Sequence, residues 1–258
     1  MVAKEKQTRA AVLDRPRRET AADQAAEALL DAIVTGAIPP GAPLRLQEVS
    51  EQLGMSMMPV REAIRRLEAL DLVEVEPHKG AWVREMSLED LEETYYARLW
   101  MECLATGEAV ARFTDADRLA AEAALAERAR AIELGNRVAA RNAHERFHFT
   151  IYEASGRPWL TRSMLPAWRN SERYRVESMR HPELLDQRAG EHEAILQAVL
   201  DRDVQAAVTR LYEHLHTSVT LVVQRLDPAA LDRGLRLPAL ADLLAAHGGK
   251  RTKRHRSG

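Results

Sequence analysis

The sequence predicts a mainly α-helical protein with an N-terminal winged helix-turn-helix, which carries a small β-hairpin wing, and a C-terminal antiparallel helical bundle. Two short helical patterns joined by a tight turn lie between residues 46 and 70. Two β-prone runs follow between residues 72 and 84, and helical patterns with short breaks then continue to about residue 226. A chain of 258 residues is long enough to form both domains with sizeable cores.

The chain begins with residues 1–18, which mix cations, acids and a proline without any periodicity. We expect this segment to be a flexible arm. Residues 22–35 have apolar side chains at helical spacing and end at Gly36, which predicts the first helix. The turn Ile38-Pro39-Pro40-Gly41 then leads into the helix-turn-helix.

The first helix of the helix-turn-helix is predicted at residues 46–53, where apolar residues recur at helical spacing. Gly54 follows it and suits the left-handed turn that ends many helices. Ser56 occupies an N-cap position, and Pro59 is tolerated in the first turn of the next helix.

The second helix has one apolar face, while Arg61, Arg65 and Arg66 lie off that face near its beginning. The wing follows as two runs, Leu72–Val75 and Ala81–Arg84, with a cation at the tip between them. In a winged helix-turn-helix such exposed positions contact DNA. The candidate DNA contacts are Ser56, Met57, Met58, Arg61, Arg65, His78, Lys79 and Gly80.

Composition limits how this protein can bind DNA. The net charge is −2, so affinity for double-stranded DNA must come from local cations and from dimerisation. The single cysteine, Cys103, excludes an intramolecular disulfide and favours a reducing compartment. Because the chain has neither an apolar targeting segment nor a run long enough to span a membrane, we expect a cytoplasmic protein without membrane contact.

The bundle is predicted to begin at the capping pattern of residues 87–90 and to continue as six or so helices. Its breaks are expected at residues 114–115, 135–136, 155–158, 181–182 and 201–203. The expected domains are therefore a winged helix at 19–86, a bundle for effector binding and dimerisation at 87–226, and an extension at 227–258. We expect one short helix at 238–246 and a solvated basic tail after it.

His144, Glu145 and His148 spell HExxH, the motif of zinc peptidases in which two histidines bind zinc and the glutamate activates water. Metzincins continue with a glycine and a third histidine, but Ile151 and Ala154 stand there. Glu172 could serve as a further zinc ligand, but the sequence near this helix has no strand pattern that could align a peptide substrate. A zinc metallopeptidase is therefore the alternative function.

The N-terminal half resembles the winged helix of GntR-type bacterial transcription regulators. The residues that carry this resemblance are Pro39-Pro40-Gly41, Leu44, Met55-Ser56, Pro59-Val60-Arg61-Glu62-Ala63, Leu67, Gly80 and Val83. The chain departs from the family at Met57-Met58, where Arg-Thr is common. The departure predicts an operator unlike those of Arg-Thr relatives.

The helical region after the wing resembles the ligand-binding domain of the FadR-like branch of the same family. That branch holds a divalent metal with an Asp-x3-His pair on one helix and a histidine from each of two later helices. Carried over residue by residue, the resemblance implies four metal ligands, which are His144, His148, His192 and His214. His144 stands where the family usually has aspartate, so the HExxH spelling arises from that replacement.

Four neutral imidazoles suit zinc, nickel, copper or cobalt rather than magnesium or calcium, and zinc or nickel is favoured. The missing carboxylate leaves more positive charge on the metal and should strengthen attraction for an anionic effector. Arg98 matches a family arginine that often faces the effector, whereas an Arg98–Glu102 surface pair is the simpler alternative.

We therefore expect a homodimeric regulator that binds a pseudo-palindromic operator and responds to a small carboxylate metabolite bound at a metal. A metal-responsive regulator with no organic effector is a further alternative.

Overall fold

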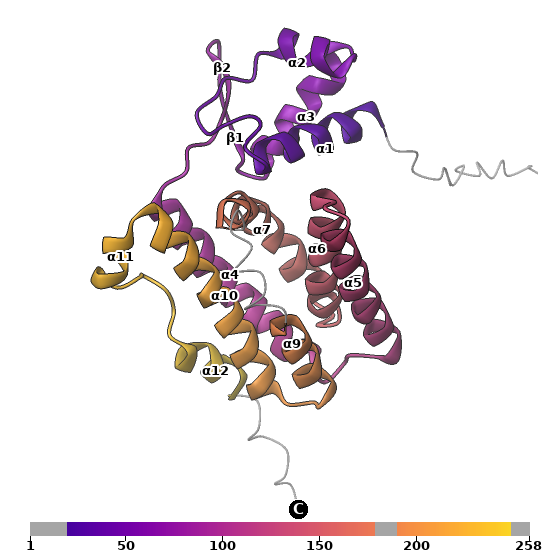
Figure 1. The fold of residues 1–258 in the computed structure, drawn as a ribbon, viewed down its shortest axis with the longest axis vertical. Helices are drawn as coiled ribbons and strands as arrows, with labels where there is room; N and C mark the ends of the chain where they lie inside the picture. Colours follow the sequence, from indigo (N-terminus) through magenta and orange to yellow (C-terminus); the bar gives the residue numbers. More distant parts are fainter. Residues whose placement is uncertain (1–19, 179–189, 249–258) are drawn as a thin grey trace, which may run out of the picture.

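The computed structural model describes residues 20–178 and 190–248. Its N-terminal unit contains the helices α1 (Ala21–Val34), α2 (Leu46–Leu53) and α3 (Met57–Ala69) and the antiparallel strands β1 (Val73–Glu76) and β2 (Gly80–Val83) (Figure 1). The predicted winged helix-turn-helix is therefore confirmed. Both strands lie one residue away from their predicted bounds, β1 later and β2 earlier, because the register pairs Val73 with Val83 and Glu76 with Gly80.

Residues at the helix ends mark where the N-terminal helices begin or stop. Thr20 and Asp23 form a reciprocal capping box that starts α1. Gly54 has the left-handed φ of 64° that ends α2. Ser56 holds the N-cap position of α3 as predicted, although its side chain makes no capping hydrogen bond. The core of this unit joins α1, α3 and the wing through Leu29, Ile33, Val60, Leu67 and Val83.

The bundle contains α4 (Leu88–Ala109), α5 (Asp115–Glu133), α6 (Arg137–Glu153), α7 (Pro158–Ser178), α9 (Glu191–Leu200) and α10 (Val204–Leu226). The N-cap side chains that start four of these helices, those of Ser87, Thr114, Asn136 and Asp203, stand at predicted breaks. The predicted break at residues 181–182 lies outside the described residues, as do the N-terminal arm and the basic tail. The described part of the bundle has no strand, as expected.

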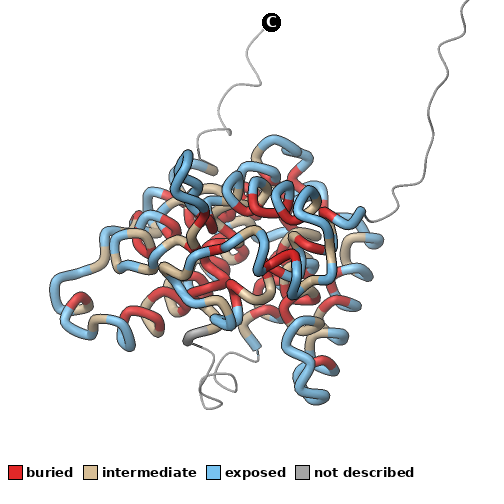
Figure 2. Tube along the Cα trace, turned by 90° about the horizontal axis from the view of Figure 1, so that it is seen from above, coloured by how far each residue is buried: buried red, intermediate tan, exposed pale blue. Residues whose placement is uncertain are grey.

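In the bundle α4 packs against α7 and α10, and α5 pairs with α6 (Figure 1). Buried residues gather along the inward faces of these helices, as Figure 2 shows from above. Trp168, Tyr95 and Tyr152 are among the largest fully buried side chains. Within the described residues, no helix is long and apolar enough to cross a membrane.

The extension after α10 packs back onto the bundle. One helix was expected there, but the structure has two, α11 (Pro228–Arg233) and α12 (Leu240–Gly248). Ala230 and Leu243 bury their side chains in the bundle core. Between the two helices, the Nε atom of Arg236 lies 2.7 Å from Glu92 Oε2 on α4. The short apolar segments therefore fold because the bundle offers a surface to cover.

Polar contacts join the N-terminal unit to the bundle. Arg141 of α6 forms an ion pair with Asp31 of α1. Arg173 of α7 donates a hydrogen bond to the backbone carbonyl of Arg84, just beyond the wing. Because both arginines are mostly buried, these contacts hold α1 and the wing against the helices of the bundle.

Candidate DNA interface and metal centre

The predicted DNA-contacting residues at the start of α3 are exposed. Met57 and Met58 keep 53% and 71% of their surface accessible, so neither contributes to the core. Arg61 and Arg65 are also exposed, and neither forms an ion pair with another described residue. Two unpaired guanidinium groups beside two exposed methionines can contact both phosphates and base edges in a major groove.

Arg66 behaves differently from the other two arginines. Its guanidinium pairs with Asp23 of α1 and Glu62 of α3, each at 2.5 Å. These carboxylates neutralise its charge and tie α3 to α1. The sequence pattern grouped Arg66 with Arg61 and Arg65, but the structure assigns it to the support of the helix-turn-helix.

The wing tip brings His78, Lys79 and Gly80 to the surface, as the pattern predicts. His78 and Gly80 both have positive φ, 66° and 123°, which makes the turn tight. The ammonium of Lys79 lies 2.5 Å from Glu76 Oε2, so the charge at the tip is paired within the wing. A phosphate would have to displace that carboxylate to bind Lys79.

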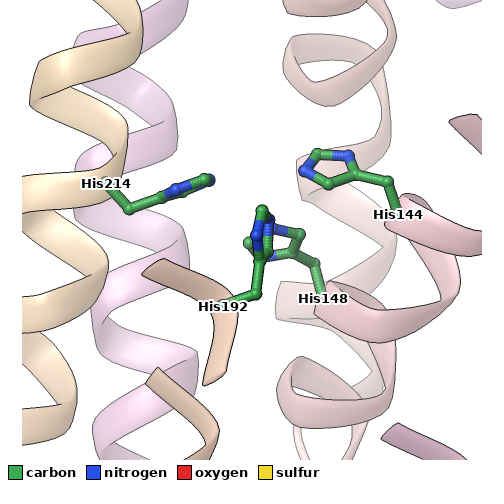
Figure 3. Close-up of side chains that lie close together, drawn as sticks. All are labelled: His144, His148, His192 and His214. Atoms are coloured by element: carbon green, nitrogen blue, oxygen red, sulfur yellow. The ribbon is translucent and has the colours of Figure 1, made fainter. Parts of the chain in front are cut away.

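Four histidines converge inside the bundle (Figure 3). His144 and His148 lie one turn apart on α6, while His192 comes from α9 and His214 from α10. All four are buried, and one ring nitrogen from each lies within 4.8 Å of the others. The structure thus brings together the four residues that the resemblance implied, including His144 in the usual place of aspartate.

Hydrogen bonds indicate which ring nitrogens carry protons. The Nδ1 atom of His214 lies 2.6 Å from Glu191 Oε2. An ionised carboxylate only accepts hydrogen bonds, so Nδ1 holds a proton, and in the neutral ring Nε2 is the nitrogen that can bind a metal. Metal-binding histidines commonly use such an outer carboxylate to fix the ring and its tautomer.

A second chain of bonds orients His148. The Tyr152 hydroxyl donates to Glu102 Oε2 at 2.5 Å and lies 3.0 Å from His148 Nδ1. Because the single hydroxyl proton goes to the carboxylate, Nδ1 of His148 must be the donor to the tyrosine oxygen. The Nε2 atom of His148 is buried and has no hydrogen-bond partner among the described residues, as expected of a ligand atom.

The electrostatics keep these imidazoles in their metal-binding form. Burial lowers the pKa of His144 well below its ordinary value, and Arg175 and His148 lower it further. Burial, with His192 and His214, likewise lowers the pKa of His148. Both rings are therefore neutral at physiological pH and have lone pairs to offer.

The size of the cluster also fits a transition metal. In a tetrahedral zinc site, two nitrogens that each lie about 2.05 Å from the ion are separated by about 3.3 Å. The observed limit of 4.8 Å therefore requires each nitrogen to move inward by at most about 0.9 Å. The four residues are thus close enough together to fit a single divalent ion.

Arg98, the predicted effector residue, lies in the interior rather than in a surface pair. Its Nε and Nη2 atoms donate to Glu102 at 2.5 and 3.2 Å, and Nη1 donates to Ser171 at 2.9 Å. The guanidinium also lies 4.7 Å from the centre of the Trp168 ring. Arg98 thus anchors the Glu102–Tyr152–His148 chain.

Glu145, which a peptidase would use as its base, is held away from the histidines. Both of its carboxylate oxygens bond to Arg169, at 2.7 and 2.9 Å, and one accepts a bond from Trp168. The strands of the described residues are confined to the wing, so no edge strand adjoins this helix. Glu172, considered above as a further ligand, is paired with Arg175 instead.

The sequence reading missed the residues that position the histidines. Glu191 directly precedes His192 in the sequence. Its hydrogen bond to His214 on the neighbouring helix cannot be predicted from the residues around it. Tyr152 follows His148 by four residues, so its place on the same helix face could have been read from the helical period. Arg141 also lies on α6, one turn before His144, and nothing in the sequence pairs it with Asp31.

Comparison with known proteins agrees with this arrangement. Residues 21–83 match the model of the bacterial regulatory proteins of the gntR family, and residues 93–217 match the FCD domain. The HTH-type transcriptional regulator McbR of Escherichia coli K12 is 28% identical over 193 residues, which cover 74% of this chain and 87% of McbR. The HTH-type transcriptional repressor GlaR of the same organism is 29% identical over 201 residues, covering 74% of this chain and 91% of GlaR.

The structural comparison gives the same result. The solved structure of E. coli McbR aligns with a TM-score of 0.71 and 26% identity, covering 81% of this chain and 99% of that one. These relatives are regulators, and nothing among them supports the peptidase alternative. The two matched domains have the same order along the chain as the winged helix and the bundle in the fold. The chain therefore belongs to the gntR family of transcription regulators with an FCD ligand-binding domain, a family of regulators and not of enzymes.

Proposed function

We propose that this regulator works as a homodimer that binds a pseudo-palindromic operator and responds to a small carboxylate metabolite at a metal in the bundle. The observation that carries the proposal is the convergence of four buried histidines in the domain that follows the winged helix. A two-fold dimer would present two copies of α3 to two half-sites of the operator.

The exposed start of α3 supports the DNA-reading role. Met57 and Met58 can only make apolar contacts, for instance with a thymine methyl group, whereas Arg61 and Arg65 can reach phosphates or guanine. Because Lys79 is already paired with Glu76, Arg61 and Arg65 are the cations of the predicted contact set that form no ion pair with another described residue. Affinity for the operator would therefore depend strongly on these two residues.

His144, His148, His192 and His214 would hold the ion, and zinc or nickel suits four imidazoles. A bound divalent ion would supply a Lewis-acidic cation to which a carboxylate can bind. Neutral imidazoles bring no negative charge to the ion, so its full positive charge is available to attract an anion. The effector is therefore proposed to be a small carboxylate.

Arg98 is proposed to act on the effector site by positioning. Three of its five N–H groups already donate to Glu102 and Ser171, so most of its hydrogen-bonding capacity is used inside the bundle. By holding Glu102 it holds Tyr152, and through Tyr152 it fixes the ring of His148. Loss of Arg98 would disturb the metal centre without removing a ligand.

The helix α6 offers a route from this centre to the operator. It carries His144 and His148, and one turn earlier Arg141 pairs with Asp31 of α1. Since α1 packs on α3, a small shift of α6 on effector binding would move the recognition helix. Coupling free energies of this kind are typically about 1–3 kcal/mol.

A set of four variants tests the proposal. His192→Ala and His214→Ala should each lower metal content and weaken the response of operator binding to carboxylates. Glu145→Ala should keep both the metal and the response. Asp31→Asn should keep the metal but weaken the response, since it removes the charge at the junction of α1 and α6.

Metal content would be measured by elemental analysis, the oligomeric state by light scattering, and operator affinity by fluorescence anisotropy with and without a panel of carboxylates. Full metal retention in both histidine variants would refute the metal centre. A response to metal alone, with none to any carboxylate, would leave a regulator without an organic effector. A monomer bound to its operator would refute the proposed dimer.

A further inference from the structure

A cavity lies at the junction of the two domains. We call it the junction pocket, and its volume is about 260 Å³. Its walls are the end of α1, the turn between α5 and α6, and the last part of α7, where the N-terminal unit lies over the bundle (Figure 1). None of the four clustered histidines lines it.

The lining of the junction pocket is rich in cationic side chains. Among its described lining residues are four arginines and no carboxylate, namely Arg128, Arg137, Arg141 and Arg175. Arg141 pairs with Asp31 and Arg175 pairs with Glu172, but Arg137 is exposed and forms no ion pair with a described residue. The pocket therefore keeps uncompensated positive charge.

Arg141 gives a more specific sign of a missing partner. The residue is only 5% exposed, and its Nε atom is buried without a hydrogen-bond partner among the described residues, although its Nη2 atom bonds to Asp31. A buried N–H of a charged group without an acceptor is costly, and native proteins usually satisfy such groups. Arg141 lines the pocket, so an anion seated there would offset the charge of this guanidinium.

The beginning of α6 adds donors to the same wall. The Asn136 side chain caps the backbone N–H of Ala139, while the N–H groups of Arg137 and Val138 have no acceptor among the described residues. Arg137 and Val138 both line the pocket. The first turn of a long helix with free N–H groups favours a negative charge.

The remaining walls are apolar. They are formed by Val34, Ala131, Ile132, Val138, Ala140 and Val176. Ile132 and Val138 are each 41% exposed, so filling the pocket would remove apolar surface from water. A ligand that matches both kinds of wall has one anionic group and one compact apolar body.

We infer that the junction pocket binds a small organic monocarboxylate with an apolar body. The carboxylate lies against Arg137, Arg141 and the first turn of α6, and the apolar part lies against Val34 and Ile132. The pocket is small compared with the roughly 300–1,000 Å³ of typical ligand sites, which restricts the ligand to about the size of a single ring or a short acyl chain.

Such a ligand would act on DNA binding directly, because its site belongs to both domains. Val34 at the end of α1 forms one wall, and residues of α5, α6 and α7 form the others. A molecule that fills the pocket fixes α1 relative to the bundle. The site would thus change operator affinity without contacting the four clustered histidines.

The test uses the full-length protein, with metal and after treatment with a chelator. The probes are benzoate, octanoate, the neutral analogue benzyl alcohol and inorganic phosphate, and affinity is measured by calorimetry. Arg137→Glu reverses the unpaired charge at an exposed position, and Arg130→Glu is the matched control because Arg130 is exposed on α5 and does not line the pocket. Crystals grown with 4-bromobenzoate would locate the ring by its anomalous signal.

We expect benzoate or octanoate to bind in the millimolar range or tighter, with or without metal. Arg137→Glu should weaken that binding roughly tenfold or more, because hydrogen bonds to charged groups are among the strong ones. Arg130→Glu should not change it, and benzyl alcohol should bind much more weakly. Bromine density between α1 and the α5–α6 turn would support the site.

Three results would overturn the inference. The first is no binding of either carboxylate at millimolar concentration. The second is binding that disappears with the metal but survives Arg137→Glu, which would place the carboxylate at the histidines. The third is equal binding of phosphate and benzoate, which would indicate a simple anion site without an apolar part.

Discussion

The chain of bonds behind His148 makes a quantitative prediction for Tyr152→Phe. Tyr152 is fully buried, and its hydroxyl lies 3.0 Å from His148 Nδ1 and 2.5 Å from Glu102 Oε2. The substitution removes one oxygen and leaves the aromatic ring in place. We therefore expect the fold to persist, while the imidazole of His148 loses the acceptor that fixes its tautomer and orientation.

Two magnitudes follow from this geometry. Loss of an outer partner of a metal-binding histidine typically lowers metal affinity 10- to 100-fold, which corresponds to about 1.4–2.7 kcal/mol. The free energy of unfolding of the metal-free protein should fall by about 1–3 kcal/mol, because the Nδ1–H group and a carboxylate oxygen are left buried without this bond. Arg98 still binds Glu102, which keeps the carboxylate paired.

The assay is competition for zinc against a chromogenic chelator, together with denaturant unfolding of the metal-free protein. Tyr212→Phe is the matched control, because Tyr212 lies on α10 beside His216 and has no part in the histidine cluster. If Tyr152→Phe binds zinc as tightly as Tyr212→Phe does, the Glu102–Tyr152 chain does not orient a ligand and the reasoning fails.

Three further predictions concern the DNA interface and the thiol. Arg61→Ala should weaken operator binding while changing the unfolding free energy by under roughly 0.5 kcal/mol, and an operator affinity equal to that of Arg130→Ala would contradict it. Met57→Arg should shift the preferred operator toward guanine, since a bidentate contact discriminates by about 1–3 kcal/mol; recovery of the same motif by binding-site selection would exclude this. Burial, with the Glu102 carboxylate, raises the pKa of the Cys103 thiol well above its ordinary value, so native protein should resist iodoacetamide at pH 8 while unfolded protein reacts; equal rates would show that the thiol is accessible.

The local structure of the chain can be predicted from short stretches of its sequence. Gly54 and Ser56 mark the turn of the helix-turn-helix, and the caps of four bundle helices stand at the breaks that the pattern predicts. Each of these features depends on a few neighbouring residues, because backbone conformation at a turn or cap is set within one helical turn. The pairing of His144 with His148 is likewise a consequence of the helical period.

Contacts between residues that are distant in the sequence depend on how the helices pack. Arg61 and Arg66 look alike in the sequence, but Asp23 is brought to Arg66 by the packing of α1 on α3. The Arg98–Glu102 pair could have been a surface contact, and the bundle buries it. The physical reason is that burial and charge pairing depend on how helices pack, and residues separated by tens of positions leave no periodic signal of their meeting. For the same reason, the sequence alone links His192 and His214 to the histidines of α6 only through the family resemblance, and the packing of α9 and α10 is what brings them together. The junction pocket has no signal in the sequence, because its walls come from four separate helices, α1, α5, α6 and α7.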